Sequence, residues 1–294
     1  MSNELSTNFA GSDLAAAMGF GEMDTTPSGP KVPMLSQVQS PIMIESVVDD
    51  DDDEVEEKVV VPLGSYKLKD SEGNEVYSRS VTIRLFAQRQ QWTQFDTDIN
   101  RSHSTVMVTK LKGDLKDSKG TFNLGRDGTY RTPEDWAALD DDTKARQSSV
   151  KNAKVLFGKV TLNKPMDAQG NPILKGYDDE IDFVCYVKNF QSKKSIDAAL
   201  QDITIKKLLP IEHTIKLTSK KEKMSTNNYA TIVATLGSKV TMKDGDQDTL
   251  RSFVDFIDNS NDYVLSEWKK LNKPDVAISP DVLDAIVQVE EAPY

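Results

Sequence analysis

The sequence predicts an α+β fold that is mainly antiparallel β: a curved sheet or barrel with three helices, flanked by two disordered acidic arms. Three observations support this prediction. Short segments of alternating apolar and polar residues, separated by turn residues, begin near residue 59 and indicate β-strands. Three longer segments are predicted to be helices: the first from its capping residues, the second from the proline that ends it, and the third from apolar residues that fall on one face of a helix. Acidic residues are concentrated toward the two ends of the 294-residue chain.

The N-terminal arm is expected to comprise residues 1–58. It holds thirteen acidic residues against Lys31 and Lys58, so its net charge is −11. Five consecutive aspartates, residues 49–53, repel one another too strongly to fold alone. One short apolar segment, residues 9–20, interrupts the arm. We expect this segment to form a helix that docks on a partner protein or on the body of the molecule.

The body, residues 59–273, is expected to be a β-rich nucleic-acid-binding domain with five or more antiparallel strands. A hairpin closes at residues 71–74, and the segment 80–95 then alternates apolar and polar side chains. Turn residues separate the later strands from one another, which favours antiparallel pairing. These further strands are predicted at residues 104–110, 153–162, 180–188, 211–220 and 229–237.

Two helices are expected between these strands. Residues 133–149 begin with the start signals of a helix, because Thr132 can cap the first turn and Pro133 suits its first position. Residues 195–209 form the second helix, which Pro210 ends.

The last helix, residues 246–272, is the strongest of the three predictions. Asp246 or Asp248 is expected to cap it, and its apolar residues fall on one face. This face is expected to pack on the sheet through Phe253, Ile257 and Trp268.

The C-terminal tail, residues 274–294, has five acidic residues and no Lys or Arg, which gives it a net charge of −5. Between the arms, residues 59–274 contain 34 basic and 29 acidic residues, a net charge of +5. The overall pI of 4.8 therefore hides a mildly basic body that is compatible with a nucleic-acid partner.

Motifs for catalysis and metal binding are absent from the sequence. Neither a GxxxxGK[ST] phosphate-binding loop nor a GxSxG motif occurs, which argues against nucleotide hydrolysis and serine-hydrolase chemistry. One cysteine and two distant histidines cannot form a zinc site. Alternating aspartates at residues 244–248 resemble the start of a calcium loop but lack its glycine, so we interpret them as capping residues. We expect a protein that is not an enzyme and that needs no cofactor or metal.

Basic residues interleaved with aromatic ones are the main functional signal. Flexible basic segments on a small sheet, with aromatic rings to stack on bases, are the components of single-strand binding. The alternative interpretation is that the lysines are solvated strand residues and the rings belong to the core. The candidate nucleic-acid-binding residues form a first group, Arg84, Arg89, Trp92, Lys110, Lys112, Lys116, Lys119, Phe122, Arg126, Tyr130 and Arg131, and a second group, Lys216, Lys220, Lys221, Lys223 and Tyr229.

Four stretches carry a resemblance to a known family: LKGDLKDSKGTFNLGRDGTYRTPEDWAAL, KVLFGKVTL, LPIEHTIKLTSKKEKMSTNNYATIVATLG and DTLRSFVDFIDNSNDYVLSEWKKLN. Over residues 59–272 the chain resembles single-stranded DNA-binding and replication or recombination accessory proteins of tailed bacteriophages. The resemblance implies an oligonucleotide-binding (OB-like) barrel, single-stranded DNA as the partner, and the cytoplasm of an infected bacterial host as the location. It also implies that the acidic tails compete with DNA and recruit phage replication or recombination proteins through residues 9–20 and 280–294.

Two other functions remain open at this point. A virion structural or scaffolding component would use the short apolar segments of the arms for docking and would show apolar surface patches. An acidic DNA mimic would inhibit a host enzyme, although its acids would be spread over a folded face rather than gathered in one run. Neither a secretory signal nor an apolar run long enough for a membrane span occurs, so we expect a soluble protein without a membrane partner. The sequence leaves the oligomeric state and the choice between DNA and RNA open.

Overall fold

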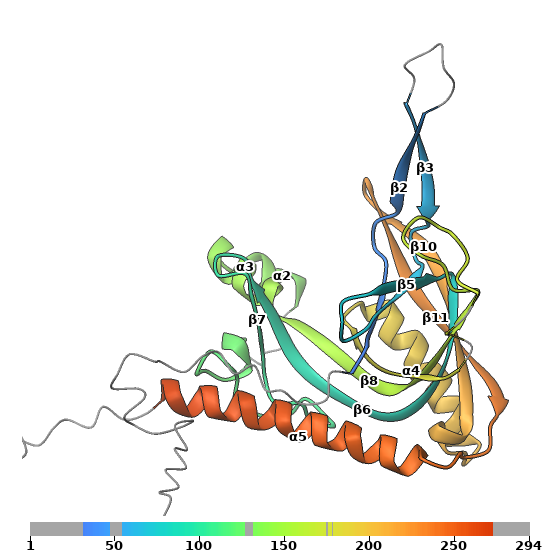
Figure 1. Cartoon of the computed structure of the whole chain (residues 1–294). Helices are drawn as coiled ribbons and strands as arrows, with labels where there is room; N and C mark the ends of the chain where they lie inside the picture. The colour runs from blue at the N-terminus through green and yellow to red at the C-terminus, as the bar shows by residue number, and fades with distance from the viewer. Residues whose placement is uncertain (1–31, 48–54, 127–131, 175, 178, 273–294) are drawn as a thin grey trace, which may run out of the picture.

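The computed structural model describes residues 32–47, 55–126, 132–174, 176–177 and 179–272. Within these residues the chain has an α+β fold, with a nine-stranded mixed sheet, a separate two-stranded ribbon and four α-helices (Figure 1). Two short 3₁₀ helices, η1 (Asn123–Gly125) and η2 (Pro210–Glu212), lie in the connections. The α+β class and the predominance of strands are as predicted, with four helices in place of the expected three.

The large sheet has the strand order β11-β10-β6-β8-β9-β1-β4-β5, with β7 beside the end of β6. All neighbouring strands pair antiparallel except β1 and β9, which are parallel. Strands β2 and β3 form the ribbon, which projects from the rest of the molecule (Figure 1). The strands are β1 (Met34–Gln37), β2 (Ile42–Val47), β3 (Val55–Val61), β4 (Tyr66–Lys69), β5 (Glu75–Ser78), β6 (Ser80–Asp96), β7 (Arg101–Ser104), β8 (Lys151–Asn163), β9 (Ile181–Val187), β10 (His213–Met224) and β11 (Asn227–Lys239).

Strands β6 and β8 are long and bend together (Figure 1). Their register shifts between Leu85 and Ala87, which marks a bulge, and bulges bend and twist the strand that carries them. Gly158 of β8 faces this bulge. A Cβ atom at residue 158 would lie 2.0 Å from the carbonyl oxygen of Arg84, so only glycine lets the two strands approach this closely.

Two helices cover opposite faces of the sheet. Helix α4 (Phe190–Ile205) buries Ile196, Ala199 and Ile203 in the larger core, together with side chains of β6, β8, β9 and β10. Helix α5 (Asp246–Leu271) buries Phe253 and Ile257 in a second core and runs along the outer side of the bend (Figure 1). The predicted packing of α5 through these two residues is confirmed. No described helix has both the length and the apolar character that crossing a bilayer requires.

The two ends of the sheet approach each other without closing a barrel. The Tyr66 hydroxyl of β4 donates a hydrogen bond to the Thr218 carbonyl of β10 at 2.8 Å, and Gln37 Nε2 donates to Ser219 Oγ at 2.8 Å. These are side-chain contacts, and no backbone ladder joins β10 or β11 to β1 or β4 in the described part of the chain. The expected curved sheet is therefore present, but it remains open.

The predicted arm boundary at residue 59 is wrong, because β1 and β2 precede it. Strand β1 lies inside the large sheet between β9 and β4, and its Leu35 is buried in the larger core. Residues around Leu35 do alternate, but the acidic run that follows them led us to assign the whole segment to the arm. The other residues of the expected arm, 1–31 and 48–54, lie outside the described residues, as does the tail from residue 273 onward.

Three local predictions also need correction. The helix predicted at 133–149 is two helices, α2 (Pro133–Ala137) and α3 (Asp141–Ser149), because the Asp140 side chain accepts a hydrogen bond from the backbone of Thr143 and starts a new helix. Helix α4 begins at Phe190 rather than at residue 195, since Asn189 caps it. The strand predicted at 104–110 is only partly present: β7 ends at Ser104, and beyond it only isolated bridges continue the pairing.

Helix α5 is not capped by either of the two aspartates predicted for that role. Gly245 is its N-cap residue, with a φ of 88° that favours glycine, and no side chain caps the first turn. Asp246, the first residue of the helix, is buried and makes other contacts.

Candidate nucleic-acid interface

Arg84, from the first predicted group, does not reach the surface. Its guanidinium is 1% exposed and makes two bidentate ion pairs. Nη1 and Nη2 donate to the two carboxylate oxygens of Asp246 at 3.0 and 2.9 Å, and Nε and Nη2 donate to Glu180 at 2.6 and 2.9 Å. Lys159 adds a contact to Asp246 at 3.3 Å and Lys243 one to Glu180 at 3.0 Å. The prediction that Arg84 binds nucleic acid is therefore wrong, because its charge is used to fix α5 on the sheet.

The pKa of Asp246 is set by this ion-pair cluster. Burial alone would raise it, but the hydrogen bonds and charge of Arg84, the backbone N–H of Lys243 and the ammonium of Lys159 outweigh burial and hold this pKa at about 2. The same kind of balance lowers the pKa of Glu180, where burial is outweighed by hydrogen bonds from Arg84 and Lys243. Asp246 is thus a carboxylate at neutral pH and acts as an anchor.

Trp92 of the first group and Trp268 of α5 each stack on a basic side chain of the same chain. The Arg126 guanidinium lies 4.6 Å from the ring centroid of Trp92, and the Lys116 ammonium lies 4.3 Å from that of Trp268. Phe122 packs on the same Trp268 ring, with 5.6 Å between centroids. Trp268 itself was predicted to pack on the sheet but is half-buried. Its Nε1 donates to the Thr121 carbonyl at 3.0 Å. These contacts fix the rings within the fold and occupy part of their faces.

The remaining described members of the first group make local contacts or are exposed. Lys119 donates to Gln94 Oε1 at 3.3 Å, and Arg89 is half-buried and donates to the neighbouring Gln88 carbonyl at 2.8 Å. Lys110 and Lys112 are exposed in the segment that follows β7. Tyr130 and Arg131 lie outside the described residues. In the first group, the charges of Lys116 and Arg126 are therefore engaged with rings of the same chain, and Arg84 is buried.

The second group forms a continuous feature, the hairpin of β10 and β11. Strand β10 pairs with β6 over residues 214–217, so the rest of the described hairpin extends beyond the sheet as a two-stranded ribbon. Between residues 213 and 239 the chain has five lysines and one glutamate. The four predicted lysines, Lys216, Lys220, Lys221 and Lys223, are all exposed.

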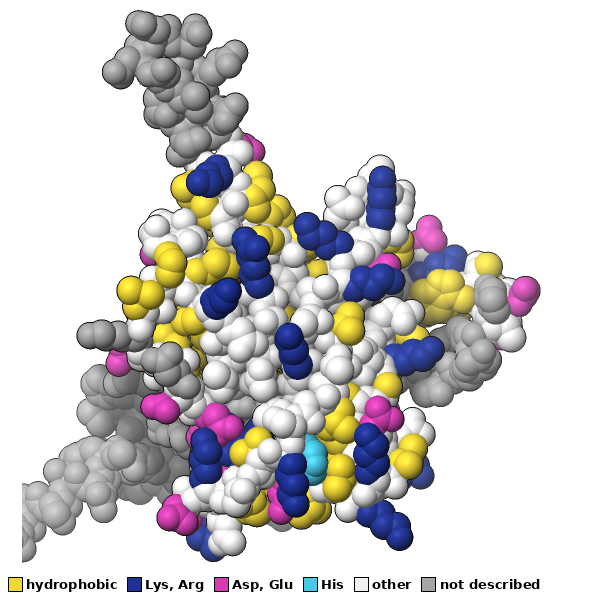
Figure 2. Space-filling view, turned by 90° about the vertical axis from the view of Figure 1, so that its right-hand side faces the viewer, with side chains coloured by type: hydrophobic (Ala, Val, Ile, Leu, Met, Phe, Trp, Pro, Cys, Tyr) yellow, Lys and Arg dark blue, Asp and Glu magenta, His cyan; other side chains and the backbone are white. Residues whose placement is uncertain are grey.

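Figure 2 shows the side of the molecule that includes this hairpin. Lys and Arg side chains are spread over the middle of this face, and most of the acidic ones lie toward its margins. Near the hairpin tip, Glu222 neutralises part of the charge through an ion pair with Lys220 at 2.8 Å. Apart from the buried Arg84, the first group lies away from the hairpin, because β10 pairs with residues 81–84 of β6 and β7 with its residues 93–96. We therefore take the hairpin as the candidate interface.

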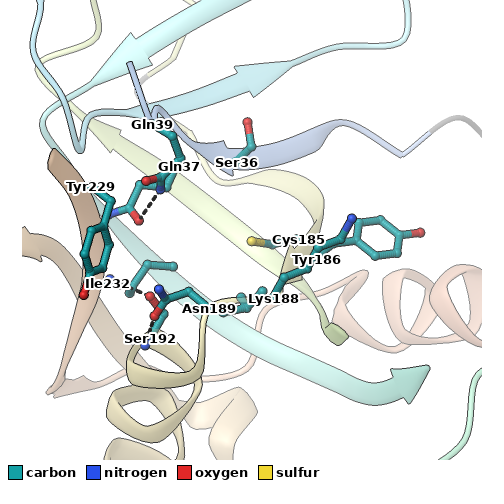
Figure 3. A pocket seen from close by; sticks show the side chains of 11 residues that line it. Ser36, Gln37, Gln39, Cys185, Tyr186, Lys188, Asn189, Ser192, Tyr229 and Ile232 are labelled. Carbon is teal, nitrogen blue, oxygen red and sulfur yellow. Dashed lines mark hydrogen bonds between the residues drawn. The ribbon is translucent and has the colours of Figure 1, made fainter. Parts of the chain in front are cut away.

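A cavity of about 360 Å³ opens beside the hairpin (Figure 3). Tyr229 and Ile232 of β11 line one side, Ser36 and Gln37 of β1 and the following Gln39 line another, and the end of β9 and the start of α4 complete it. The ring of Tyr229, half-buried, forms part of the wall. The last contributors, Cys185, Tyr186, Val187, Lys188, Asn189 and Ser192, come from one continuous segment.

Hydrogen bonds fix the walls of this cavity. Ser192 and Ser195 of α4 accept hydrogen bonds from the backbone N–H groups of Ile232 and Ala234 at 2.9 Å each, which fastens the helix to the edge of β11. On the other side, Gln39 pairs with the backbone of Ala230 through both atoms of its amide group, at 3.1 and 3.3 Å. The cavity is thus preformed by its own contacts.

Cys185 lines the cavity but offers little reactivity. Burial raises the pKa of its thiol to about 12, so the thiol is protonated and a weak nucleophile at neutral pH. The described residues also contain no group of three or more His, Cys, Asp or Glu side chains placed to hold a metal ion.

Sequence patterns did not identify the cavity residues contributed by β1 and α4. Gln37 and Gln39 lay within the segment assigned to the disordered arm. Lys188 ended a predicted strand, and Asn189 lay between that strand and a helix placed five residues too late. The available signals were the alternation in residues 34–38 and the capping preference of Asn189. Comparison of the chain with protein-family models, with curated proteins and with solved structures finds no match.

Proposed function

We propose that the protein binds single-stranded DNA along the hairpin of β10 and β11. The observation that supports this proposal best is the excess of lysines on the hairpin, five against one glutamate, in a chain whose overall charge is −11. A basic surface on an acidic protein is a local feature, and the phosphate groups of nucleic acids are common ligands of such surfaces. The resemblance to phage single-stranded DNA-binding proteins supports the same proposal and adds a role in replication or recombination.

The chemistry of binding follows from the side chains. Lysine ammonium groups contact backbone phosphates and release counterions. These contacts make the affinity fall with rising salt, and they do not depend on the base sequence. Because the hairpin tip extends beyond the sheet, its lysines on both faces can reach the same strand. Tyr229, on the strand opposite these lysines, supplies a ring on which a base can stack.

The test is a titration of labelled oligo(dT) of about 30 nucleotides, longer than the roughly 4 to 16 nucleotides that one domain of this kind covers. The variant Lys220→Gln/Lys221→Gln/Lys223→Gln is compared with the full chain at several salt concentrations. We expect weaker binding and a plot of log affinity against log salt that is less steep by about 2, or about 0.7 for each lost phosphate contact. The melting temperature should be unchanged, because exposed charges contribute little to stability.

The matched control is Lys110→Gln/Lys112→Gln/Lys269→Gln, which removes the same charge from exposed lysines at the other end of β6. It should keep the salt dependence of the full chain. If the control variant loses binding and the hairpin variant keeps it, the interface lies at the first group instead. Absence of binding to oligo(dT) by the full chain at about 20 mM salt, where screening is weak, would refute the proposal as a whole.

A second candidate function, a component of a larger assembly such as a virion, is favoured by the ribbon of β2 and β3. Met43 is 48% exposed and Val59 49% exposed, and they lie opposite each other on the ribbon. Isolated two-stranded ribbons are only marginally stable in water, so a partner that covers these side chains would stabilise this one. Sedimentation velocity tests this candidate: Met43→Ser/Val59→Ser should dissociate any oligomer that the full chain forms.

A further inference from the structure

We propose that the cavity beside the hairpin binds a single nucleobase of the DNA strand, with a preference for thymine. This inference rests on the proposed function and deepens it, because it assigns a place where base identity is recognised. Three observations support it: the size and lining of the cavity, the polar groups left free inside it, and its position next to the lysines.

The cavity has the size and lining of a small-ligand site. About 360 Å³ lies near the lower end of the range for such sites, and it suits one nucleoside rather than a dinucleotide. Tyr229, Ile232 and Val187 supply apolar surface against which a flat base can pack. The ring of Tyr229 stands at one side of the cavity (Figure 3), where it can stack on the base.

The free polar groups of the cavity are mainly donors. Asn189 Oδ1 accepts the backbone N–H of Ser192 at 2.9 Å, which leaves the amide NH₂ group without a partner among the described residues. Lys188 and the Tyr229 hydroxyl also make no ion pair or hydrogen bond within the described part of the chain. Gln37 and Gln39, in contrast, bond to each other, and Gln37 also bonds to Ser219.

Donors in the cavity favour a base with acceptors on its edge. Thymine presents the O4 carbonyl where cytosine presents an amino group, so an Asn189 amide that donates to O4 would face a donor in cytosine. A partly buried donor that faces another donor loses its hydrogen bond, which discriminates between the two bases. A contact of the Asn189 amide with position 4 of the pyrimidine would thus favour thymine over cytosine.

The position of the cavity lets a base and its phosphates bind together. Tyr229 pairs with Glu222 in the hairpin, so Lys220 lies diagonally across on the same face, whereas Lys221 and Lys223 point to the other face of the hairpin. Lys188 lies in the wall of the cavity itself. A base stacked on Tyr229 therefore has Lys188 and Lys220 near it to contact the flanking phosphates, while Lys221 and Lys223 can contact phosphates farther along the strand.

The first test separates base contacts from phosphate contacts. Binding of oligo(dT), oligo(dC) and an abasic oligomer of the same length is measured for the full chain and for Tyr229→Leu, which keeps apolar bulk but has no ring. The full chain should bind oligo(dT) most tightly. Tyr229→Leu should weaken oligo(dT) binding about tenfold and leave abasic binding unchanged. Tyr229→Phe, which keeps the ring, is the matched control and should retain most of the stacking.

Asn189→Ser tests the preference for thymine. Serine retains the capping function for α4 but lacks the amide donor, so this variant should lose most of the ratio between oligo(dT) and oligo(dC) while its melting temperature stays close to that of the full chain. If oligo(dT), oligo(dC) and the abasic oligomer bind the full chain equally well, the base pocket is refuted and the proposed DNA binding stands. If no oligomer binds, both proposals are refuted.

A crosslinking experiment is independent of variant folding. Oligo(dT) that carries 5-iododeoxyuridine is bound to the unmodified full chain and irradiated, and the crosslinked tryptic peptide is identified by mass spectrometry. Residues 224–239 form one tryptic peptide in which Tyr229 is the only aromatic residue. We expect the crosslink at Tyr229. Crosslinks confined to Trp92, Phe122 or Trp268 would contradict the pocket and move the base contacts to the first group.

Discussion

Arg84 lies in β6 with its guanidinium buried between two carboxylates. The alternation of the strand predicts only that Arg84 lies on the face opposite Ile83 and Leu85. The pattern cannot show that α5 begins over that face and brings Asp246, from a position 162 residues later, into contact with it. A basic residue in a strand is therefore predicted to be a surface residue, but in the fold Arg84 has a buried carboxylate partner and anchors α5.

The ion pair between Arg84 and Asp246 makes stability depend on pH. Because the pKa of Asp246 is about 2 in the folded state, below its ordinary value, the unfolded chain takes up the proton first. The stabilisation is present above about pH 4 and is lost as pH falls through about 2. For Asp246→Asn we expect a loss of about 3 to 5 kcal/mol at pH 7, and the difference from the full chain should shrink by about 2 kcal/mol toward pH 2.

Denaturant unfolding at both pH values measures this difference. Asp248→Asn is the matched control, since Asp248 is exposed and its ion pair within the described residues is with Arg251, one turn later. It should change the free energy of unfolding by less than about 0.5 kcal/mol. Equal differences for Asp246→Asn at neutral and acidic pH would contradict the assignment of a low pKa to Asp246.

Among the helices, α5 shows most clearly what periodicity can predict. Its apolar face, its length and its burial through Phe253 and Ile257 follow from the sequence, because a long helix with one apolar stripe has one way to bury it. Its first turn was misjudged because capping depends on which side chains are free, and the carboxylate of Asp246 is taken by Arg84. Trp268 was misjudged because the last turns of α5 pack on Thr121 and Phe122 rather than on the sheet.

Phe253 should be the apolar residue of α5 that contributes most to stability. Its ring is fully buried and packs on Phe157 and Phe86, with centroids 5.7 and 6.0 Å away. We expect Phe253→Ala to lower the free energy of unfolding by about 3 to 5 kcal/mol in urea titrations. Val254→Ala changes the adjacent, partly exposed residue and should cost less than about 1 kcal/mol. Similar losses for the two variants would show that α5 is not held by this core.

Long-range pairing limited the prediction of the other elements. Strands 153–162, 180–188, 211–220 and 229–237 were predicted within a few residues, since each carries its own alternation. Strand β1 has only four residues, and its place in the sheet is set by β4 and β9. The cavity was unpredictable for the same reason, because it joins side chains from residues 36–39, 185–192 and 229–232. Only Tyr229 among them belonged to the predicted site.

For the molecule as a whole, we expect the acidic segments to compete with DNA. A tethered acidic chain near a basic surface acts at an effective concentration that can reach the mM range. Because β1 begins at Met34, the deletion must stop before it: residues 1–31 and 273–294 are removed, and residues 49–53 are changed to Asn. This variant should bind oligo(dT) more tightly than the full chain, most of all near 0.01 M salt, where the Debye length is about 30 Å.

The salt dependence provides the control for this experiment. Above about 0.1 M salt the Debye length falls to about 10 Å, and the affinities of the variant and the full chain should converge. Equal affinities at low salt would show that these segments do not compete for the hairpin.

The parallel pairing of Met34 with Val184 has a consequence for biosynthesis. Strand β1 leaves the ribosome before the strand that covers one of its edges, which follows about 150 residues later. At about 5 to 20 residues per second, this edge waits about 8 to 30 s for its partner. Unpaired strand edges recruit other chains, so the half-made polypeptide is the form most exposed to aggregation and most in need of a chaperone.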